Sequence, residues 1–272
     1  MSRRLPSPPP PAQPASGRAA RRRAAEESAR RERRRRRGGP VAIAVRTTAE
    51  LCLTAGALML LLAVYQLWYT NVLADRAAGQ VTSTLQRQWD TGAPAAPPGG
   101  DGAGGTVPAG QGFAVLHIPS LGMESPIAQG VSKTKVLDQG MVGHYDGTGG
   151  PASAMPGDKE GNFALAAHRN SHGEPFRRIN RLHAGDLVVV ETRDTYYTYE
   201  ITSSLPQTSP SNTAVVRPVP EGSGFTAPGR YLTLTTCTPE FTSTYRLVVW
   251  GKLASERPRS QGPPPALTDT HS

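Results

Sequence analysis

The sequence predicts an all-β domain, in the form of a closed barrel, carried behind one membrane-spanning helix. Three observations lead to this prediction. An uncharged apolar run of 18 residues, 51–68, lies near the N-terminus. Short segments rich in β-branched and aromatic residues follow it, separated by Gly, Pro, Asn and Asp, as in proteins built from many short strands. Pro- and Gly-rich stretches flank these segments and mark off residues 113–253 as a unit of ordinary domain size.

The positive charge of the chain is concentrated at its N-terminus. The chain has 30 Lys and Arg against 21 Asp and Glu, and residues 1–46 alone hold 14 arginines and three glutamates. The rest of the chain is nearly neutral, so we expect no nucleic-acid partner of the folded part. A nuclear-localisation or RNA-binding arm is the alternative for such an arginine run. Because large apolar side chains are scarce, we predict that 1–46 is a disordered, Arg/Pro-rich cytoplasmic tail.

The apolar run predicts a transmembrane signal-anchor helix over residues 47–70. Eighteen helical residues extend about 27 Å, close to the ~30 Å hydrocarbon thickness of a bilayer. Trp68 and Tyr69 stand at the far end, as interfacial aromatic residues do. The arginines on the near side predict a single-pass protein of the cell membrane with a cytoplasmic N-terminus and an extracellular domain. A cleaved signal peptide ending near Ala74 is the alternative, although the run is longer than the usual h-region.

The predicted elements after the membrane follow in order. Residues 71–112 form a juxtamembrane segment, with a helical pattern over 71–89, and a Pro/Gly linker. Brief helical patterns occur at 132–137 and 175–182, and residues 254–272 form a disordered C-terminal tail. Strands are predicted for six segments of the domain: 114–118, 163–168, 186–192, 195–202, 231–237 and 245–253.

Cys237 is the candidate nucleophile of the domain. The other cysteine, Cys52, lies in the apolar run, so a disulfide between the two would require Cys52 to leave the membrane. Leucines and threonines alternate before Cys237, and the period of two places it on the threonine face of its strand. A buried structural thiol is the alternative. The position of Cys237 at a strand end, beside Pro239 and a polar turn, favours a catalytic role for its thiol.

Attack on an amide also needs a general acid and a group that stabilises the oxyanion. His168 is the candidate acid, because it closes a predicted strand at the entry to a polar loop. Arg246 follows Cys237 across a predicted hairpin, and its guanidinium suits an oxyanion or a substrate carbonyl. Alternatively, Arg246 is a solvent-exposed charged residue at the edge of a strand, with no part in catalysis. The other histidines are assigned to a half-exposed strand position, to loops and to the tail: His117, His144, His172, His183 and His271.

A metal site is an alternative for His168 and His172, which are four residues apart as in zinc-binding helices. The residues between and after them, including Gly173 and Pro175, are poor helix formers, and no HExxH motif or cysteine pair accompanies them. No glycine-rich phosphate loop follows a strand either. We therefore expect no metal and no cofactor.

Together these residues resemble those of the sortases. TLTTC at 233–237 resembles the TLxTC signature of that family, AHR at 167–169 resembles its histidine segment, and Arg246 stands in the next strand as the family's arginine does. The segment 143–192 is similar to the class E subgroup of high-GC actinobacteria. The likeness covers about residues 113–253, and the order of tail, anchor, linker and C-terminal domain fits as well.

The resemblance implies an eight-stranded sortase barrel with short helices and a cysteine transpeptidase. Cys237 attacks the Thr–Gly amide of an LAxTG-like C-terminal sorting signal, and His168 protonates the leaving amine. Arg246 holds the substrate and stabilises the oxyanion, and Thr236 and Thr235 contribute to substrate binding. The implied partners are secreted proteins bearing the signal, a lipid-linked peptidoglycan precursor and the membrane.

Two other functions remain compatible with the sequence. A cysteine endopeptidase would use the same residues but release its product to water. A tethered β-domain that binds cell-wall polymer or protein without chemistry would need Cys237 only as a structural thiol.

Overall fold

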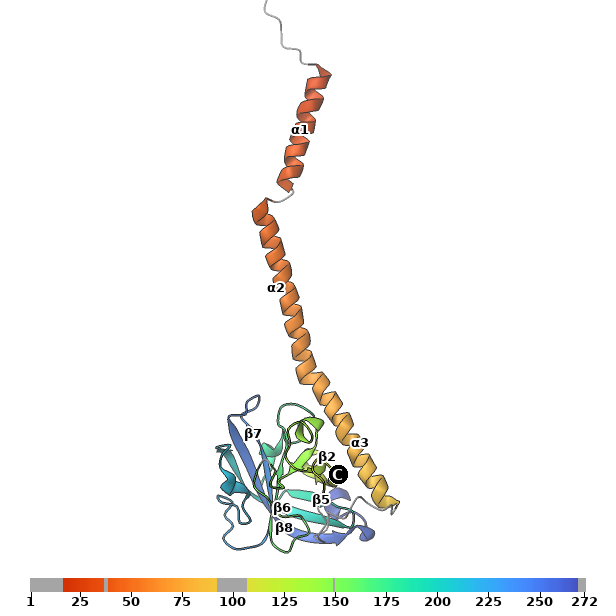
Figure 1. Ribbon diagram of the computed structural model, residues 1–272, viewed down its shortest axis with the longest axis vertical. Coiled ribbons are helices and arrows are strands. Elements are labelled where there is room, and N and C mark those ends of the chain that lie inside the picture. Colours follow the sequence, from red (N-terminus) through yellow and green to blue (C-terminus); the bar gives the residue numbers. More distant parts are fainter. Residues whose placement is uncertain (1–16, 37–38, 92–106, 149, 269–272) are drawn as a thin grey trace, which may run out of the picture. The chain divides into compact units, whose positions relative to one another are not determined.

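The computed structural model describes residues 17–36, 39–91, 107–148 and 150–268 (Figure 1). They divide into two compact units, Met1–Leu62 and Ala63–Ser272. The first unit contains α1 (Arg18–Arg36) and most of α2 (Pro40–Val64). The structure is therefore helical over much of the predicted disordered tail, while residues 1–16 lie outside the described part. Alanine and arginine dominate α1 and both favour helices, so local propensity accounts for this difference.

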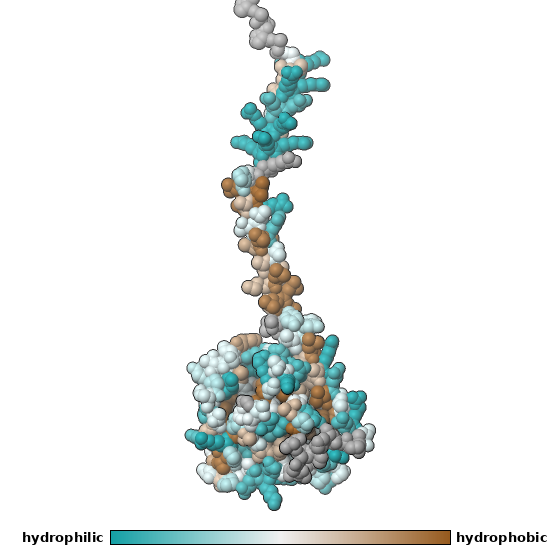
Figure 2. Space-filling view, in the orientation of Figure 1, coloured by the Kyte–Doolittle hydropathy of each residue, from teal (hydrophilic) through white to brown (hydrophobic). Residues whose placement is uncertain are grey.

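α2 has the length and composition of a membrane span. Among the described residues, one helical stretch, ending at Val64, contains a window apolar and long enough to cross a bilayer, and none of that window is buried. Large apolar side chains such as Leu53 are exposed along it, and Figure 2 shows apolar surface gathered on α2, whereas the surface of α1 is polar. The predicted span, 47–70, falls in α2, a π-helical turn (Tyr65–Tyr69) and the first residue of the next helix.

α3 (Thr70–Asp90) packs against the barrel within the second unit, and it contains the predicted helix at 71–89. Its buried residues recur at the spacing of one helix face: Ala74, Ala78, Thr82 and Leu85. A Cβ on Gly140 would lie 2.8 Å from the carbonyl oxygen of Ala74, and Gly140 has a φ of +74°, so only glycine suits this contact. α3 is thus part of the folded domain, and residues 92–106 of the predicted linker lie outside the described part.

Eight strands close into a barrel in the order β1-β2-β3-β4-β7-β8-β6-β5, as predicted (Figure 1). The pairs β2/β3 and β4/β7 are parallel and the other neighbours are antiparallel. Side chains such as Phe163, Leu232 and Leu234 fill the interior. The strands are β1 (Gly112–Ile118), β2 (Met123–Gln129), β3 (Val142–His144), β4 (Gly161–Ala166), β5 (Leu187–Glu191), β6 (Thr195–Thr208), β7 (Arg230–Thr238) and β8 (Tyr245–Pro258).

Two of these strands, β2 and β3, were not predicted from the sequence. β2 reads MESPIAQ, in which a proline and three polar residues obscure the strand pattern. β3 has three residues and ends at His144, which is 2 % exposed and therefore not the loop residue that we expected. Where brief helices were expected, the structure has the 3₁₀ turns Leu137–Gln139 and Ile179–Arg181.

The C-terminal tail is ordered further than its composition predicts. β8 extends to Pro258, and a 3₁₀ turn (Arg259–Gln261) and the short helix α4 (Pro265–Thr268) follow it. Arg259 donates to buried Glu191 at 2.9 Å and lies 3.0 Å from Asp90 of α3. A buried carboxylate requires such a partner, so Arg259 fixes the start of the tail. Disorder is therefore wrong for residues 254–268, and residues 269–272 lie outside the described part.

Candidate active site

β7 and β8 place Cys237 and Arg246 opposite each other. The two are register partners in the antiparallel ladder, and opposite residues of such a ladder present their side chains on one face. Leu232 and Leu234 belong to the interior core, so the period of two puts Cys237 on the outer face, as the alternation predicts. Cys237 is half-buried and its thiol is free.

β4 brings His168 to the same end of the barrel. β4 runs parallel to β7, with Ala166 opposite Thr235. Beyond the last residue of β4, the backbone N–H of Ala167 donates to the carbonyl of Thr235 at 3.3 Å, and the hydroxyl of Thr236 donates to the carbonyl of Ala167 at 2.8 Å. His168 lies two residues past the strand rather than in it, and these bonds hold it beside the end of β7.

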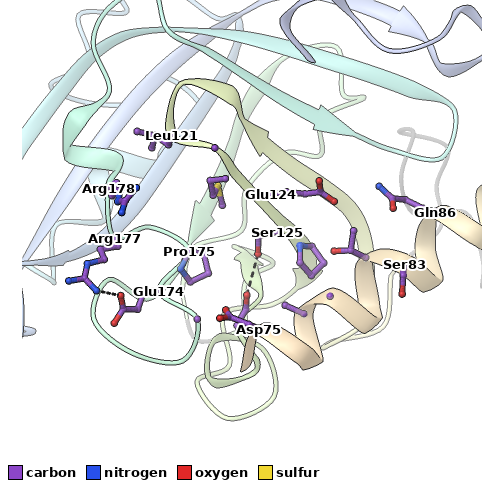
Figure 3. Close-up of a pocket in the computed structure, with 18 residues that line it drawn as sticks. Asp75, Ser83, Gln86, Leu121, Glu124, Ser125, Glu174, Pro175, Arg177 and Arg178 are labelled. Carbon is purple, nitrogen blue, oxygen red and sulfur yellow. Dashed lines mark hydrogen bonds and ion pairs between the residues drawn. The ribbon is translucent and has the colours of Figure 1, made fainter. Parts of the chain in front are cut away.

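One cleft of about 850 Å³ is lined by the three predicted catalytic side chains, Cys237, His168 and Arg246. Thr235 and Thr236 line it too, and Tyr145, Val216 and Phe241 add apolar surface. A cleft with apolar walls and a few convergent polar groups suits a peptide. A separate groove of about 750 Å³ lies between α3, β2 and the loop 173–178, and none of the predicted site residues line it (Figure 3).

The hydroxyl groups of Thr235 and Thr236 bond within the protein. Thr235 donates to the carbonyl of Leu165 at 3.0 Å, and its oxygen lies 3.0 Å from the hydroxyl of Tyr145. Thr236 is bonded to Ala167, as described above. The bonds of both threonines therefore stabilise the wall of the cleft around Cys237. Their part in substrate binding stays a prediction.

Two arginines fix the ends of the strands that form the cleft. Arg169, which is 7 % exposed, donates from Nη1 to the hydroxyl of Thr238 at 2.8 Å and to the carbonyl of Cys237 at 3.3 Å. These bonds connect Arg169, the residue after His168, to β7, the strand that carries the thiol of Cys237. Arg246 donates from Nη1 to the carbonyls of Ser243 and Tyr245, at 2.9 and 3.0 Å. These bonds hold one end of its guanidinium group against the loop between β7 and β8.

His168 has a carboxylate partner from another part of the chain. Its Nε2 lies 2.7 Å from Oδ1 of Asp138, and the ammonium of Lys133 bonds both oxygens of Asp138 at 2.8 and 3.0 Å. Burial alone would raise the pKa of Asp138, but the bonds from Lys133 and His168 hold that pKa below its usual value. Burial lowers the pKa of His168 below 6.5, and Asp138 opposes this shift. Asp138 therefore orients His168 and favours its protonated form.

We expect Asp138→Asn to lower kcat about 10- to 100-fold, the value of a hydrogen bond to a charged group, with a smaller change in KM. Loss of the carboxylate removes an influence that raises the pKa of His168. The limb of the activity profile that reports the ionisation of His168 should therefore move to lower pH. The check is kcat/KM for peptide cleavage against pH, in the presence of a chelator.

Lys133→Ala is the matched control, because Lys133 lowers the pKa of His168. In this variant the limb that reports His168 should move to higher pH, opposite to its shift in Asp138→Asn. If both variants moved the limb in the same direction, or neither moved it, Asp138 would not act through the charge of His168.

Asp138, Arg169 and Tyr145 were not singled out as site residues from the sequence. Their contacts join residues that are 30, 68 and 90 positions apart. No local pattern marks such a contact. The nearest signal was the AHR segment, which contains Arg169, although nothing in it indicates a bond to the end of β7.

Comparison with known proteins agrees with this geometry. Residues 116–254 match the model of the sortase domain. The chain is 56% identical to sortase SrtE1 of Streptomyces coelicolor over 229 residues, which cover 84% of this chain and 62% of that protein's length. It is 42% identical to sortase SrtE2 of the same organism over 214 residues, covering 78% of this chain and 83% of that protein.

Solved structures show the same relationship. The crystal structure of sortase E1 from Streptomyces coelicolor with a tripeptide in the active site has a TM-score of 0.57 and 62% identity, covering 60% of this chain and 99% of that one. Sortase E from Streptomyces avermitilis has a TM-score of 0.52 and 40% identity, covering 59% and 99%. The chain belongs to the sortase family, whose members are cysteine transpeptidases. Within that family it is a class E sortase.

Proposed function

We propose that this chain is a membrane-anchored transpeptidase that cleaves an LAxTG-like C-terminal sorting signal between Thr and Gly and joins the protein to an amine of a peptidoglycan precursor. One observation carries the proposal: Cys237, His168 and Arg246, from three different strands or strand ends, line one cleft. The tripeptide in the active site of the Streptomyces coelicolor enzyme supports a peptide substrate.

The first half of the reaction forms an acyl-enzyme. The thiolate of Cys237 attacks the carbonyl carbon of the signal's threonine, and the carbonyl oxygen becomes an oxyanion. Nη1 of Arg246 is held by main-chain carbonyls. Its remaining donors are proposed to stabilise the oxyanion. The imidazolium of His168 gives its proton to the leaving glycine amine, and the thioester remains on Cys237.

The second half reverses these roles. An incoming amine attacks the thioester carbonyl, and His168, now neutral, takes the proton that the amine loses. Collapse of the tetrahedral intermediate returns the thiolate of Cys237 and releases the new amide. The bond between Asp138 and Nε2 of His168 steadies the ring while its charge changes.

The proposed organisation follows the sequence. The Arg-rich tail, 1–46, is cytoplasmic, 47–70 anchors the chain, and the catalytic domain lies outside the cell. The partners are secreted proteins bearing the sorting signal and a lipid-linked precursor. Anchoring keeps the cleft near both, which raises their effective concentration without any added contact.

The test uses the full chain in detergent, because α3 and the tail after β8 pack on the barrel. Mass spectrometry follows an LAxTG peptide incubated with the protein, with and without triglycine. We expect an acyl adduct of Cys237 and a product in which the peptide up to Thr is joined to triglycine. A peptide of the same composition in scrambled order is the control.

Other outcomes separate the alternatives. An adduct that yields only the free acid at every triglycine concentration would identify an endopeptidase rather than a transpeptidase. The absence of any adduct, with both peptides recovered intact, would contradict sortase chemistry on this peptide and favour a binding domain.

A further inference from the structure

The loop after β4 and the 3₁₀ turn at 137–139 bring three metal-ligating side chains together. One ligand atom of each of Asp138, His168 and His172 lies within 4.8 Å of the others. Nε2 of His168 is 2.7 Å, and Nδ1 of His172 3.8 Å, from the same oxygen of Asp138. The two imidazole rings lie 5.4 Å apart, with an angle of 33° between their planes.

This donor set is the one that zinc favours. Two imidazole nitrogens and a carboxylate oxygen occupy three corners of many zinc sites, and the fourth corner stays open to water. Zinc bonds of ~2.0–2.1 Å place neighbouring ligand atoms ~3.3 Å apart, within the range of the distances seen here. From the sequence we expected no metal at His168 and His172, because the residues between and after them are poor helix formers. The structure has no helix there, but Asp138 supplies a third donor.

We propose that Asp138, His168 and His172 bind a zinc ion that switches the enzyme off. The inference rests on the proposed role of His168 as acid and base. A metal on Nε2 of His168 takes the place of the proton that bonds Asp138 there. It also withdraws charge from the ring, so Nδ1 cannot hold the second proton that the leaving amine requires, and the transpeptidation cannot proceed. The ion must displace the ammonium of Lys133 from Asp138 and the hydroxyl of Ser171 from Nδ1 of His172.

Lys133 therefore sets how tightly the metal binds. Its side chain is 70% exposed and free to swing into solvent, but its charge opposes a cation at Asp138. Calcium should not bind in the place of zinc, because calcium prefers six to eight oxygen ligands.

The test measures zinc binding separately from catalysis. Full-length Cys237→Ala protein, freed of metal with a chelator, is titrated with zinc against a chromophoric chelator, and with cobalt(II) to record its visible absorption. We expect one zinc per chain and a tetrahedral cobalt spectrum. His172→Asn should weaken binding at least about tenfold, since it removes a ligand. Asparagine tolerates the left-handed φ of +55° at this position, so the loop should keep its fold. Lys133→Ala should tighten binding.

Peptide cleavage gives the second readout. Zinc should inhibit the wild-type enzyme, and excess chelator should restore its activity. His172→Asn should cleave at the wild-type rate without metal and need at least about tenfold more zinc for inhibition. His183→Asn, which removes an exposed histidine elsewhere, should respond like wild type.

Three results would overturn the proposal. The first is no zinc binding by the Cys237→Ala protein while the wild type binds, which would put the metal on the thiol. The second is unchanged affinity in His172→Asn, and the third is no binding by any form at millimolar zinc. An inactive protein that still binds zinc through His172 would instead contradict the proposed function and leave the metal site standing.

Discussion

Cys237→Ala is expected to abolish cleavage of the sorting peptide, with a fall of roughly 10⁴-fold or more in kcat. A thioester needs a thiol, and among the described residues that line the cleft Cys237 supplies it. Initial rates and mass spectrometry of the trapped enzyme provide the measurement. The acyl adduct should disappear together with product.

Cys52→Ala is the matched control for this variant. Cys52 is exposed on α2, within the predicted membrane span, and is the other free cysteine of the chain. Its replacement should leave the cleavage rate unchanged. The structural alternative for Cys237 predicts the reverse pattern, namely a lower melting temperature for Cys237→Ala and undiminished cleavage at temperatures where the variant is folded.

Arg246→Ala is expected to lower kcat about 10²- to 10³-fold, the usual result of removing one group that stabilises an oxyanion. The side chain lies opposite Cys237 in the ladder, and the carbonyls of Ser243 and Tyr245 hold one end of it. Lysine keeps the charge but cannot bond these carbonyls and the oxyanion in the same fork geometry. Arg246→Lys should therefore recover only a small part of the activity.

Arg257→Ala tests whether any arginine of β8 has this effect. Arg257 lies near the other end of the same strand and bonds the carbonyls of Gln261 and Gly262. Its loss should lower thermal stability slightly and leave kcat unchanged. Equal losses of kcat in Arg246→Ala and Arg257→Ala would show that Arg246 supports only the strand.

The main catalytic candidates could be found from the sequence because their signals are local. The two-residue period of 231–237 places Cys237 on one face of a strand whatever the rest of the barrel does. Arg246 follows across a single hairpin, and the signature TLTTC with its histidine segment identifies the family. The apolar run likewise predicts a span by length alone, and the structure contains a helix that fits it.

The elements that were missed or misjudged depend on distant partners. β2 is a strand because β1 and β3 pair with it on either side, although proline and polar residues weaken its own pattern. The segment after β8 is ordered because Arg259 reaches Glu191, 68 residues away. Its composition predicted disorder, because amino-acid composition carries no information about a single long-range ion pair.

The sequence by itself therefore determined the family, the candidate membrane span, the barrel class and the three residues proposed to act in catalysis, because each is recorded in neighbouring positions of the chain. Only the tertiary structure decided what surrounds them: the carboxylate of Asp138 on His168, the bond from Arg169 to the strand of Cys237, and the helix α3 packed on the barrel. These contacts form when folding closes the barrel and brings remote segments together, and the burial that accompanies closure lowers the pKa of His168 while Asp138 opposes this shift.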